Sequence, residues 1–143
     1  MSLNTSPNMN AALPAQTVNF VARKGPAARA LPAGFESLAP FVETWALETE
    51  TQRNAQRHAV GMEAILAFRD AILPQVDDVV AYLNGYALAT LDEHPEAMTL
   101  MYLLLSLAEI APAIEFYNQP AVIDGYESAR FRADESFVMR PLP

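Results

Sequence analysis

Residues 97–114 form the most apolar stretch of the chain. Their polar members Thr99, Tyr102, Ser106 and Glu109 recur at spacings of three and four, which places them on one narrow stripe of a helix. Nearly every other position is apolar, so we expect neighbouring elements to cover most of this helix. The stretch is at the lower length limit for a bilayer span, it contains Glu109 and Pro112, and no Lys or Arg cluster flanks it. The pattern therefore predicts the buried core helix of a folded domain.

Three further helices are expected before this one. Pro40 suits the first turn of a short helix that ends near Leu47. Thr49 and Gln52 have the spacing of a capping box, which begins a long helix that ends near Leu73. Gly61 would lie inside that helix, where a close approach of two helices would explain it. The predicted apolar face of the long helix comprises Ala55, Ala59, Met62, Leu66 and Leu73.

Pro74 ends the long helix and suits the start of the next, for which Asn84 and Gly85 form a C-terminal cap. The buried side of this helix is expected to hold Val76, Val80 and Leu83. Short connections favour antiparallel neighbours. The sequence thus predicts an all-α protein, a small antiparallel bundle of three long helices and one short helix over residues 35–118. Residues 1–34 form an extended N-terminal arm, and residues 119–143 form an irregular C-terminal tail.

Both tails contain one short stretch that is typical of a strand, at residues 17–21 and 136–139. An isolated pair of short strands is marginal in water. These strands must therefore pair with each other against the bundle or add to a sheet edge of another chain, and we favour the second arrangement. Its candidate partner-binding residues are Val18, Phe20, Phe137 and Val138.

Composition and charge narrow the classes of function. The chain has no cysteine, which excludes disulfides, thiolate metal ligands and a cysteine nucleophile. Residues 1–34 carry three cations and no acid, whereas residues 35–143 carry six arginines against all 17 acidic residues, so +3 and −11 give the net charge of −8. An acidic body repels nucleic acid and anionic membranes, and neither is an expected partner. The N-terminal residues lack the apolar run of a secretory signal, so we expect a cytoplasmic protein.

Glu109 is the main candidate for chemistry, because a carboxyl group on a buried helix can donate or accept a proton. Alternatively, Glu109 forms an ion pair with Arg53, Arg57 or Arg69 of the long helix, or its stripe faces solvent or a partner. The sequence leaves these alternatives open.

Tyr102 and Trp45 are the other candidate ligand-binding residues, in a pocket that would also contain Glu109. A di-iron bundle needs Glu-x-x-His pairs, but Ala55 and Leu91 stand three positions before His58 and His94. No phosphate-binding glycine loop occurs, and Ser106 has no histidine nearby in sequence. The sequence therefore predicts no metal, no cofactor and no catalytic residue.

Three short runs resemble a known group of proteins: WALxTE at residues 45–50, AILP at 71–74 and LAEIAP at 107–112. They are similar to runs in small, uncharacterised bacterial all-helical proteins that accompany ring-hydroxylating oxygenase components. The resemblance covers about residues 35–120 and brings no catalytic motif. It implies an accessory subunit of such an assembly.

Together, the small acidic bundle, its long tails and the lack of an active-site motif favour one function. We expect a non-catalytic accessory or interaction subunit of a larger metabolic assembly, which the resemblance suggests is an oxygenase, with another protein chain as its partner. One alternative is a small-molecule-binding or enzymatic bundle that uses Glu109 and Tyr102. Another is a homodimer of structural role in which the tails swap between protomers.

Overall fold

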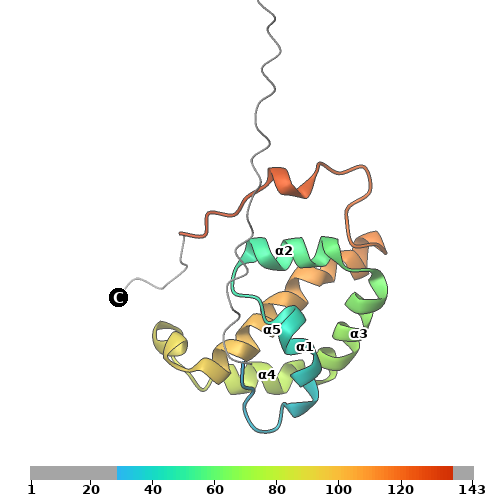
Figure 1. Ribbon diagram of the computed structural model, residues 1–143. Coiled ribbons are helices and arrows are strands. Elements are labelled where there is room, and N and C mark those ends of the chain that lie inside the picture. The colour runs from blue at the N-terminus through green and yellow to red at the C-terminus, as the bar shows by residue number, and fades with distance from the viewer. Residues whose placement is uncertain (1–28, 137–143) are drawn as a thin grey trace, which may run out of the picture.

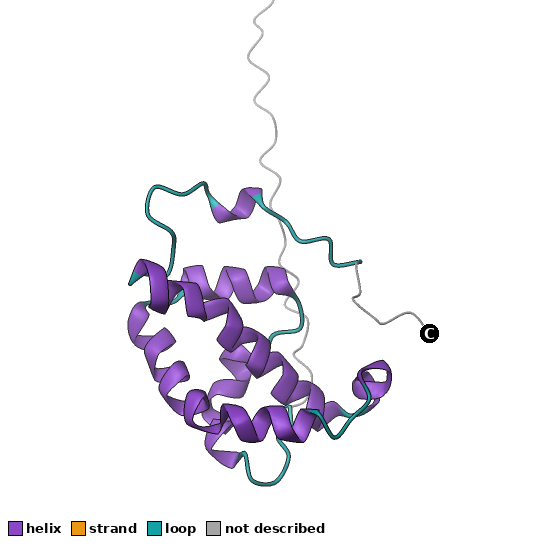
Figure 2. Cartoon of the chain, turned by 180° about the vertical axis from the view of Figure 1, so that it is seen from behind, coloured by secondary structure: helices purple, strands orange, loops and turns teal. Residues whose placement is uncertain are grey.

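The computed structural model describes residues 29–136, and within this range it contains helices and loops but no strand (Figures 1 and 2). The predicted all-α class is therefore confirmed. The four candidate partner-binding residues of the tails, Val18, Phe20, Phe137 and Val138, lie outside the described residues. The α-helices are α1 (Ala39–Trp45), α2 (Glu50–Ala59), α3 (Met62–Ile72), α4 (Val76–Leu83) and α5 (Pro95–Pro112).

The longest helix, α5, lies at the centre and contacts each of the other four α-helices (Figure 1). Its residues Leu100, Leu103 and Ile110 are fully buried. Trp45 of α1 stacks on Phe68 of α3, with their ring centroids 4.8 Å apart, and both side chains belong to the same core. Among the described residues, the segment Pro95–Tyr117 is long and apolar enough to cross a membrane. Of its most apolar 18 residues, 39% are buried in the body.

The predicted long helix is in fact two helices, which is a correction. Val60 and Gly61 are both extended, with ψ angles of 158° and 166°, and Gly61 begins α3. A Cβ atom placed on Gly61 would meet nothing within 4 Å, so a close helix contact does not explain this glycine. A β-branched residue followed by glycine is a weak point for a helix, and the chain turns there from α2 into α3.

This break also explains why the predicted apolar face was wrong. Because α3 is a separate helix with its own rotation, a face extended from α2 through Gly61 does not continue into it. The core residues of α3 are Ile65, Phe68 and Ile72, whereas Leu73 is 50% exposed. In α4 the buried residues are Val79 and Leu83, and Val80 is 39% exposed. The buried residues of α2 are not alanines but Arg53 and Arg57.

The ends of the described body are also specified locally. Leu31 packs against the core, and Arg29 contacts the body, so packing begins before residue 35. At the other end Pro112 is the last residue of α5, because its nitrogen cannot donate to the carbonyl of the preceding turn. A π-helical turn, Ala113–Tyr117, follows and stops at Asn118, whose φ angle of 51° is left-handed.

Residues 118–136, which we call the strap, then run across α2 on the outside of the body (Figures 1 and 2). They contain one short 3-10 turn, Ser128–Arg130. The carbonyl of Pro120 accepts a hydrogen bond of 2.6 Å from Arg57. Near the other end of the strap, the Glu135 carboxylate accepts from the backbone N–H of Thr51 over 3.0 Å. The strap is thus attached to α2 at two points.

Candidate functional site

Glu109 is held by two side chains of α2. Arg57 Nε donates to Glu109 Oε1 over 2.9 Å, and Asn54 Nδ2 donates to the same oxygen over 3.1 Å. The charged side chains of Arg57 and Glu109 are only 11% and 17% exposed. Of the three arginines named as possible partners, Arg57 forms the pair. The carboxylate therefore joins α2 to α5, and through Arg57 it is also linked to the strap.

Two more polar side chains complete the contact between α1, α2 and α5. Ser106 Oγ of α5, which is fully buried, donates to the carbonyl of Trp45 over 2.5 Å. Arg53 Nη1 donates to the carbonyls of Leu47 and Glu48, over 3.0 and 3.2 Å. These carbonyls lie at and just beyond the end of α1, where a helix lacks internal donors. The buried arginine and serine thus satisfy backbone groups that the fold takes out of water.

Tyr102 lies on the same stripe of α5, next to the N-terminal end of the described body. The guanidinium of Arg29 lies 4.7 Å from the centroid of the Tyr102 ring, and its Nη2 donates to Glu48 Oε1 over 2.5 Å. Burial and the nearby Glu48 carboxylate raise the pKa of Tyr102, although the cations Arg29 and Arg53 oppose this shift. The ring packs against the core and covers part of it.

The three predicted ligand-binding residues therefore occupy different environments. Glu109 and Tyr102 lie on one side of α5 with partners inside the chain. The Trp45 ring is 2% exposed and stacks on Phe68, so it belongs to the core. The structure thus gives all four polar residues of the predicted stripe a position that faces other elements of the body.

The remaining candidates for chemistry have structural partners. His58 Nδ1 lies 2.8 Å from the carbonyl of Asn54 in its own helix, and the His94 ring packs on Tyr86 at 4.6 Å. Among residues 29–136, no group of three or more His, Asp or Glu side chains could hold a metal ion. The contacts of Arg53, Arg57, Ser106 and Glu109 are an ion pair and hydrogen bonds that join the helices to one another and to the strap.

A tyrosine pair lies at the end of α4. The hydroxyl groups of Tyr82 and Tyr86 are 3.0 Å apart, and Phe35 meets the Tyr82 ring edge-on at 5.7 Å. The hydrogen bond with Tyr86, together with burial, raises the pKa of Tyr82 to about 12. The hydrogen bond therefore favours the protonated hydroxyl of Tyr82.

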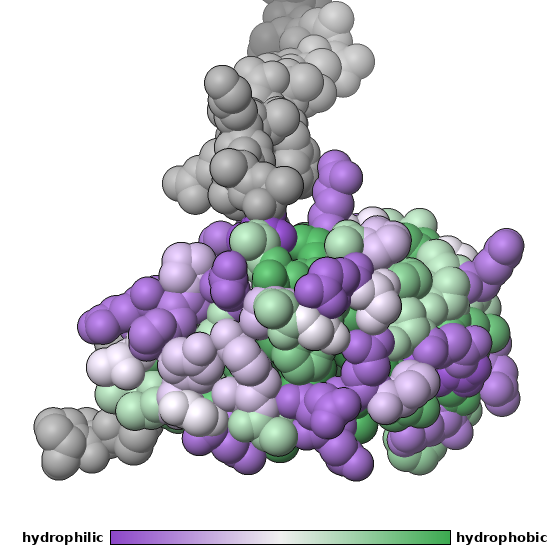
Figure 3. Space-filling model, turned by 90° about the horizontal axis from the view of Figure 1, so that it is seen from below, coloured by the Kyte–Doolittle hydropathy of each residue, from purple (hydrophilic) through white to green (hydrophobic). Residues whose placement is uncertain are grey.

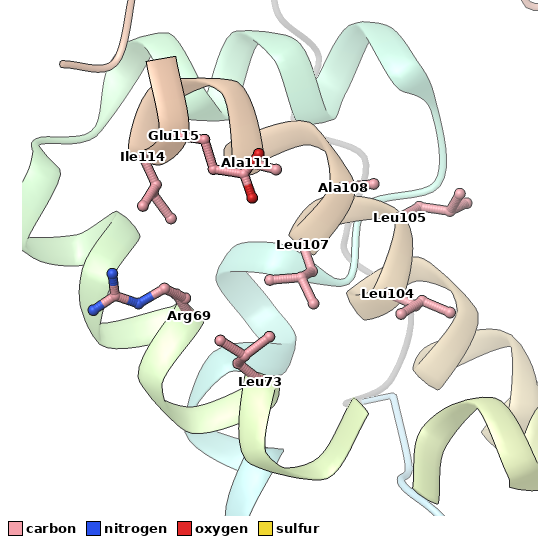
Figure 4. A pocket seen from close by; sticks show the side chains of 9 residues that line it. All are labelled: Arg69, Leu73, Leu104, Leu105, Leu107, Ala108, Ala111, Ile114 and Glu115. Atoms are coloured by element: carbon pink, nitrogen blue, oxygen red, sulfur yellow. The ribbon is translucent and has the colours of Figure 1, made fainter. Parts of the chain in front are cut away.

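The opposite side of α5 is apolar, yet much of it is at the surface. Neighbouring elements bury or partly bury most residues of this helix, but Leu105 is 39% exposed and Ala108 is also exposed. Between α3 and α5 lies a cavity of about 380 Å³, which we call the α3–α5 groove (Figure 4). It is lined by Arg69, Leu73, Leu104, Leu105, Leu107, Ala108, Ala111, Ile114 and Glu115.

A second apolar surface follows the chain from the π-helical turn into the strap. Five large apolar or aromatic side chains within 16 positions are between 45% and 79% exposed: Phe116, Val122, Ile123, Tyr126 and Phe131. On the underside of the view in Figure 1, hydrophobic residues are interspersed with hydrophilic ones (Figure 3). Sequence analysis missed both apolar surfaces. The signal for the second was available, because four of these residues, Val122, Ile123, Tyr126 and Phe131, lie in the segment predicted to be irregular, where so many large apolar side chains are unusual.

Comparisons with protein-family models, with curated proteins and with solved structures find no match for this chain. The functional argument therefore depends on the geometry of the two apolar surfaces and the polar contacts between the helices.

Proposed function

We propose that this chain is a non-catalytic interaction subunit that binds another protein chain through its strap. The observation that carries the proposal is the row of exposed strap side chains Val122, Ile123, Tyr126 and Phe131, which Phe116 of the preceding π-helical turn extends. Exposed apolar surface of this kind typically marks a site of protein interaction. Aromatic side chains are also enriched among the residues that contribute most to binding.

The attachment of the strap to α2 makes it a suitable binding element. Arg57 holds the Pro120 carbonyl, and Thr51 holds the Glu135 carboxylate through both its backbone N–H and its hydroxyl, the latter over 2.5 Å. A segment that is already held loses less conformational freedom on binding than a free one. More of the free energy of apolar burial is then available for affinity.

The polar contacts between helices support a structural role for the proposed ligand residues. Glu109 has two donors on one oxygen and is 17% exposed, so a substrate would have to compete with Arg57 and Asn54. We therefore place the interaction at the strap. Because of the resemblance noted above, components of ring-hydroxylating oxygenases are the first partner chains to test.

The test is the native mass of the complex that contains this chain, purified from the cells that make it. The strap variant Tyr126→Ser/Phe131→Ser removes two side chains that are 79% and 72% exposed. Leu88→Ser is the matched control, because Leu88 is 57% exposed but lies before α5, outside the strap.

We expect the wild-type chain and the control to co-purify with the same partner masses, and the strap variant to lose them while its circular dichroism spectrum stays unchanged. A folded strap variant that keeps every partner contradicts the proposal. So does a wild-type chain that carries no partner at all.

A further inference from the structure

One face of α5 is partly exposed and has the spacing of a helix–helix contact. Met101, Leu104, Ala108, Ala111 and Glu115 follow one another at alternating steps of three and four, the repeat by which helices pack side by side. Met101 and Leu104 also pack against the core, and Ala108 is exposed. All of these residues except Met101 line the α3–α5 groove, whose lining is almost entirely aliphatic. Small residues in the middle, Ala108 and Ala111, permit another helix to approach closely.

The groove has one charged end, and the two charges there have opposite signs. Arg69 comes from α3, on one side of the groove, and Glu115 comes from the π-helical turn, on the other side (Figure 4). Leu107 and Ile114 point into the space between the helices, and Leu73 lies opposite Leu107 (Figure 4). Arg69 is bound to its neighbour Asp70 through Nε and Nη2, and Nη1 takes no part in these two hydrogen bonds. This arm of the guanidinium is suited to a second carboxylate.

We propose that the α3–α5 groove is the contact surface for a second copy of this chain. A two-fold axis that runs along the groove, between its two sides, brings Arg69 of each copy opposite Glu115 of the other. The same operation sets α5 of one copy against α3 of the other, so that the aliphatic residues of both copies face each other. A two-fold contact requires a surface that is complementary to itself, and one cation beside one anion provides this.

The same charges disfavour other occupants. A fatty-acid-like anion could pair with Arg69 but would be repelled by Glu115, and an aliphatic cation could pair with Glu115 but would be repelled by Arg69, whereas a second copy satisfies both charges. Elsewhere two copies with a net charge of −8 each repel one another. The groove is a surface on which opposite charges can meet across the contact. This dimer also differs from the tail-swapped homodimer, because it uses only helices within the described residues.

The test is sedimentation equilibrium of the full-length chain over a range of concentrations. We expect wild-type protein to reach about twice the chain mass of 15.7 kDa. Ala108→Glu places a carboxylate of each copy against the aliphatic side chains of the other, where it loses water without gaining a partner, and should raise the dissociation constant about 100-fold or more. Val80→Glu, at a residue of α4 that is 39% exposed, is the matched control and should leave it unchanged.

A charge exchange tests the proposed axis itself. In a dimer of the Arg69→Glu variant, a glutamate at position 69 faces Glu115 of the other copy at both contacts. In a dimer of the Glu115→Arg variant, Arg69 faces an arginine at position 115 at both contacts. Each variant should therefore raise the dissociation constant about tenfold or more. In an equimolar mixture of the two variants, however, every contact between copies regains opposite signs. We expect the mixture to form a heterodimer about as tightly as the wild type dimerises.

Other outcomes overturn the proposal. The proposal is wrong if wild-type protein stays monomeric at all concentrations. This holds whether its groove is empty, its native mass spectrum shows a bound small aliphatic molecule, or the protein binds lipid vesicles. If the mixture of the two charge variants stays monomeric, Arg69 and Glu115 do not pair across the contact. If only the strap variant Tyr126→Ser/Phe131→Ser abolishes the dimer, the contact between copies lies at the strap and not at the groove. Failure here leaves the proposed function open, because that depends on partner masses and the strap.

Discussion

Replacing Glu109 with glutamine tests whether the carboxylate stabilises the contact between α2 and α5. Glutamine keeps an oxygen within reach of Arg57 Nε and Asn54 Nδ2, which donate over 2.9 and 3.1 Å, so the change removes mainly the charge. Breaking a buried ion pair costs about 3–5 kcal/mol, and a hydrogen bond to a charged group contributes about 1.5–3 kcal/mol. Because Glu109 is 17% exposed and its geometry is kept, we expect a loss of about 2 kcal/mol.

The assay is urea unfolding followed by circular dichroism, with thermal melting alongside. A loss of this size should lower the midpoint temperature by roughly 8 °C, at about 4 °C per kcal/mol for a body of this size. Glu43→Gln, at an exposed position of α1, is the matched control and should change the free energy of unfolding by less than about 0.5 kcal/mol. An effect of Glu109→Gln no larger than this control would refute the reasoning.

A double-mutant cycle separates the pair from its surroundings. Arg57→Gln also weakens the hydrogen bond to the Pro120 carbonyl, but this loss cancels in the coupling energy. We expect a coupling between Arg57 and Glu109 of about 1–2 kcal/mol. A coupling near zero would show that the contact adds nothing, whatever the single variants do. If Glu109 instead served a ligand, Glu109→Gln would abolish binding and leave the melting temperature unchanged.

Three further predictions follow from particular contacts. Ser106→Ala removes the buried Oγ donor of the Trp45 carbonyl, which keeps the backbone N–H of Leu47 as a donor over 2.9 Å. The change should therefore cost about 0.5–1.5 kcal/mol in urea unfolding, against no change for an exposed serine. The pKa of Tyr82 is raised to about 12 from an ordinary 10.0, so its protonated hydroxyl stabilises the fold fully below pH 10 and loses this effect as the pH rises to 12. Tyr82→Phe should therefore flatten the dependence of the free energy of unfolding on pH between pH 10 and 12. An unchanged slope would exclude the hydrogen bond with Tyr86. Removing residues 1–28 keeps every contact described here, so the helical circular dichroism signal should persist, and its collapse would place those residues in the core.

The sequence was sufficient for the fold class and for the position of the central helix, because both depend on strong local patterns. The stripe of Thr99, Tyr102, Ser106 and Glu109 does lie on one side of α5, and the capping box at Thr49 is present with both of its hydrogen bonds. The break at Gly61 was missed because an isolated glycine is compatible with a helix interior, and tertiary packing decided otherwise.

The direction in which the polar stripe of the central helix faces was left open by the sequence. An apolar surface is normally buried and a polar stripe exposed, yet here the stripe packs inward because Arg53 and Arg57 of α2 lie there too. No single-helix pattern shows that a neighbouring helix will bury its arginines. The pairing of Glu109 with Arg57 was among the alternatives, but it joins residues 52 positions apart and needed the fold to select it. The exposed strap was missed for a different reason, since irregular segments carry no periodicity from which to read exposure.

Hydrogen exchange of the strap in the complex tests the central claim most directly. The protein is purified from the cells that make it, once as the intact complex and once after separation from its partner, and exchange of residues 118–136 is followed by mass spectrometry. We expect exchange around Ile123, Tyr126 and Phe131 to slow at least about tenfold in the complex, while the buried core of α3, at Ile65 and Phe68, changes little. If the strap exchanges at the same rate in both samples, its apolar side chains are not covered by a partner, and the proposed function is wrong.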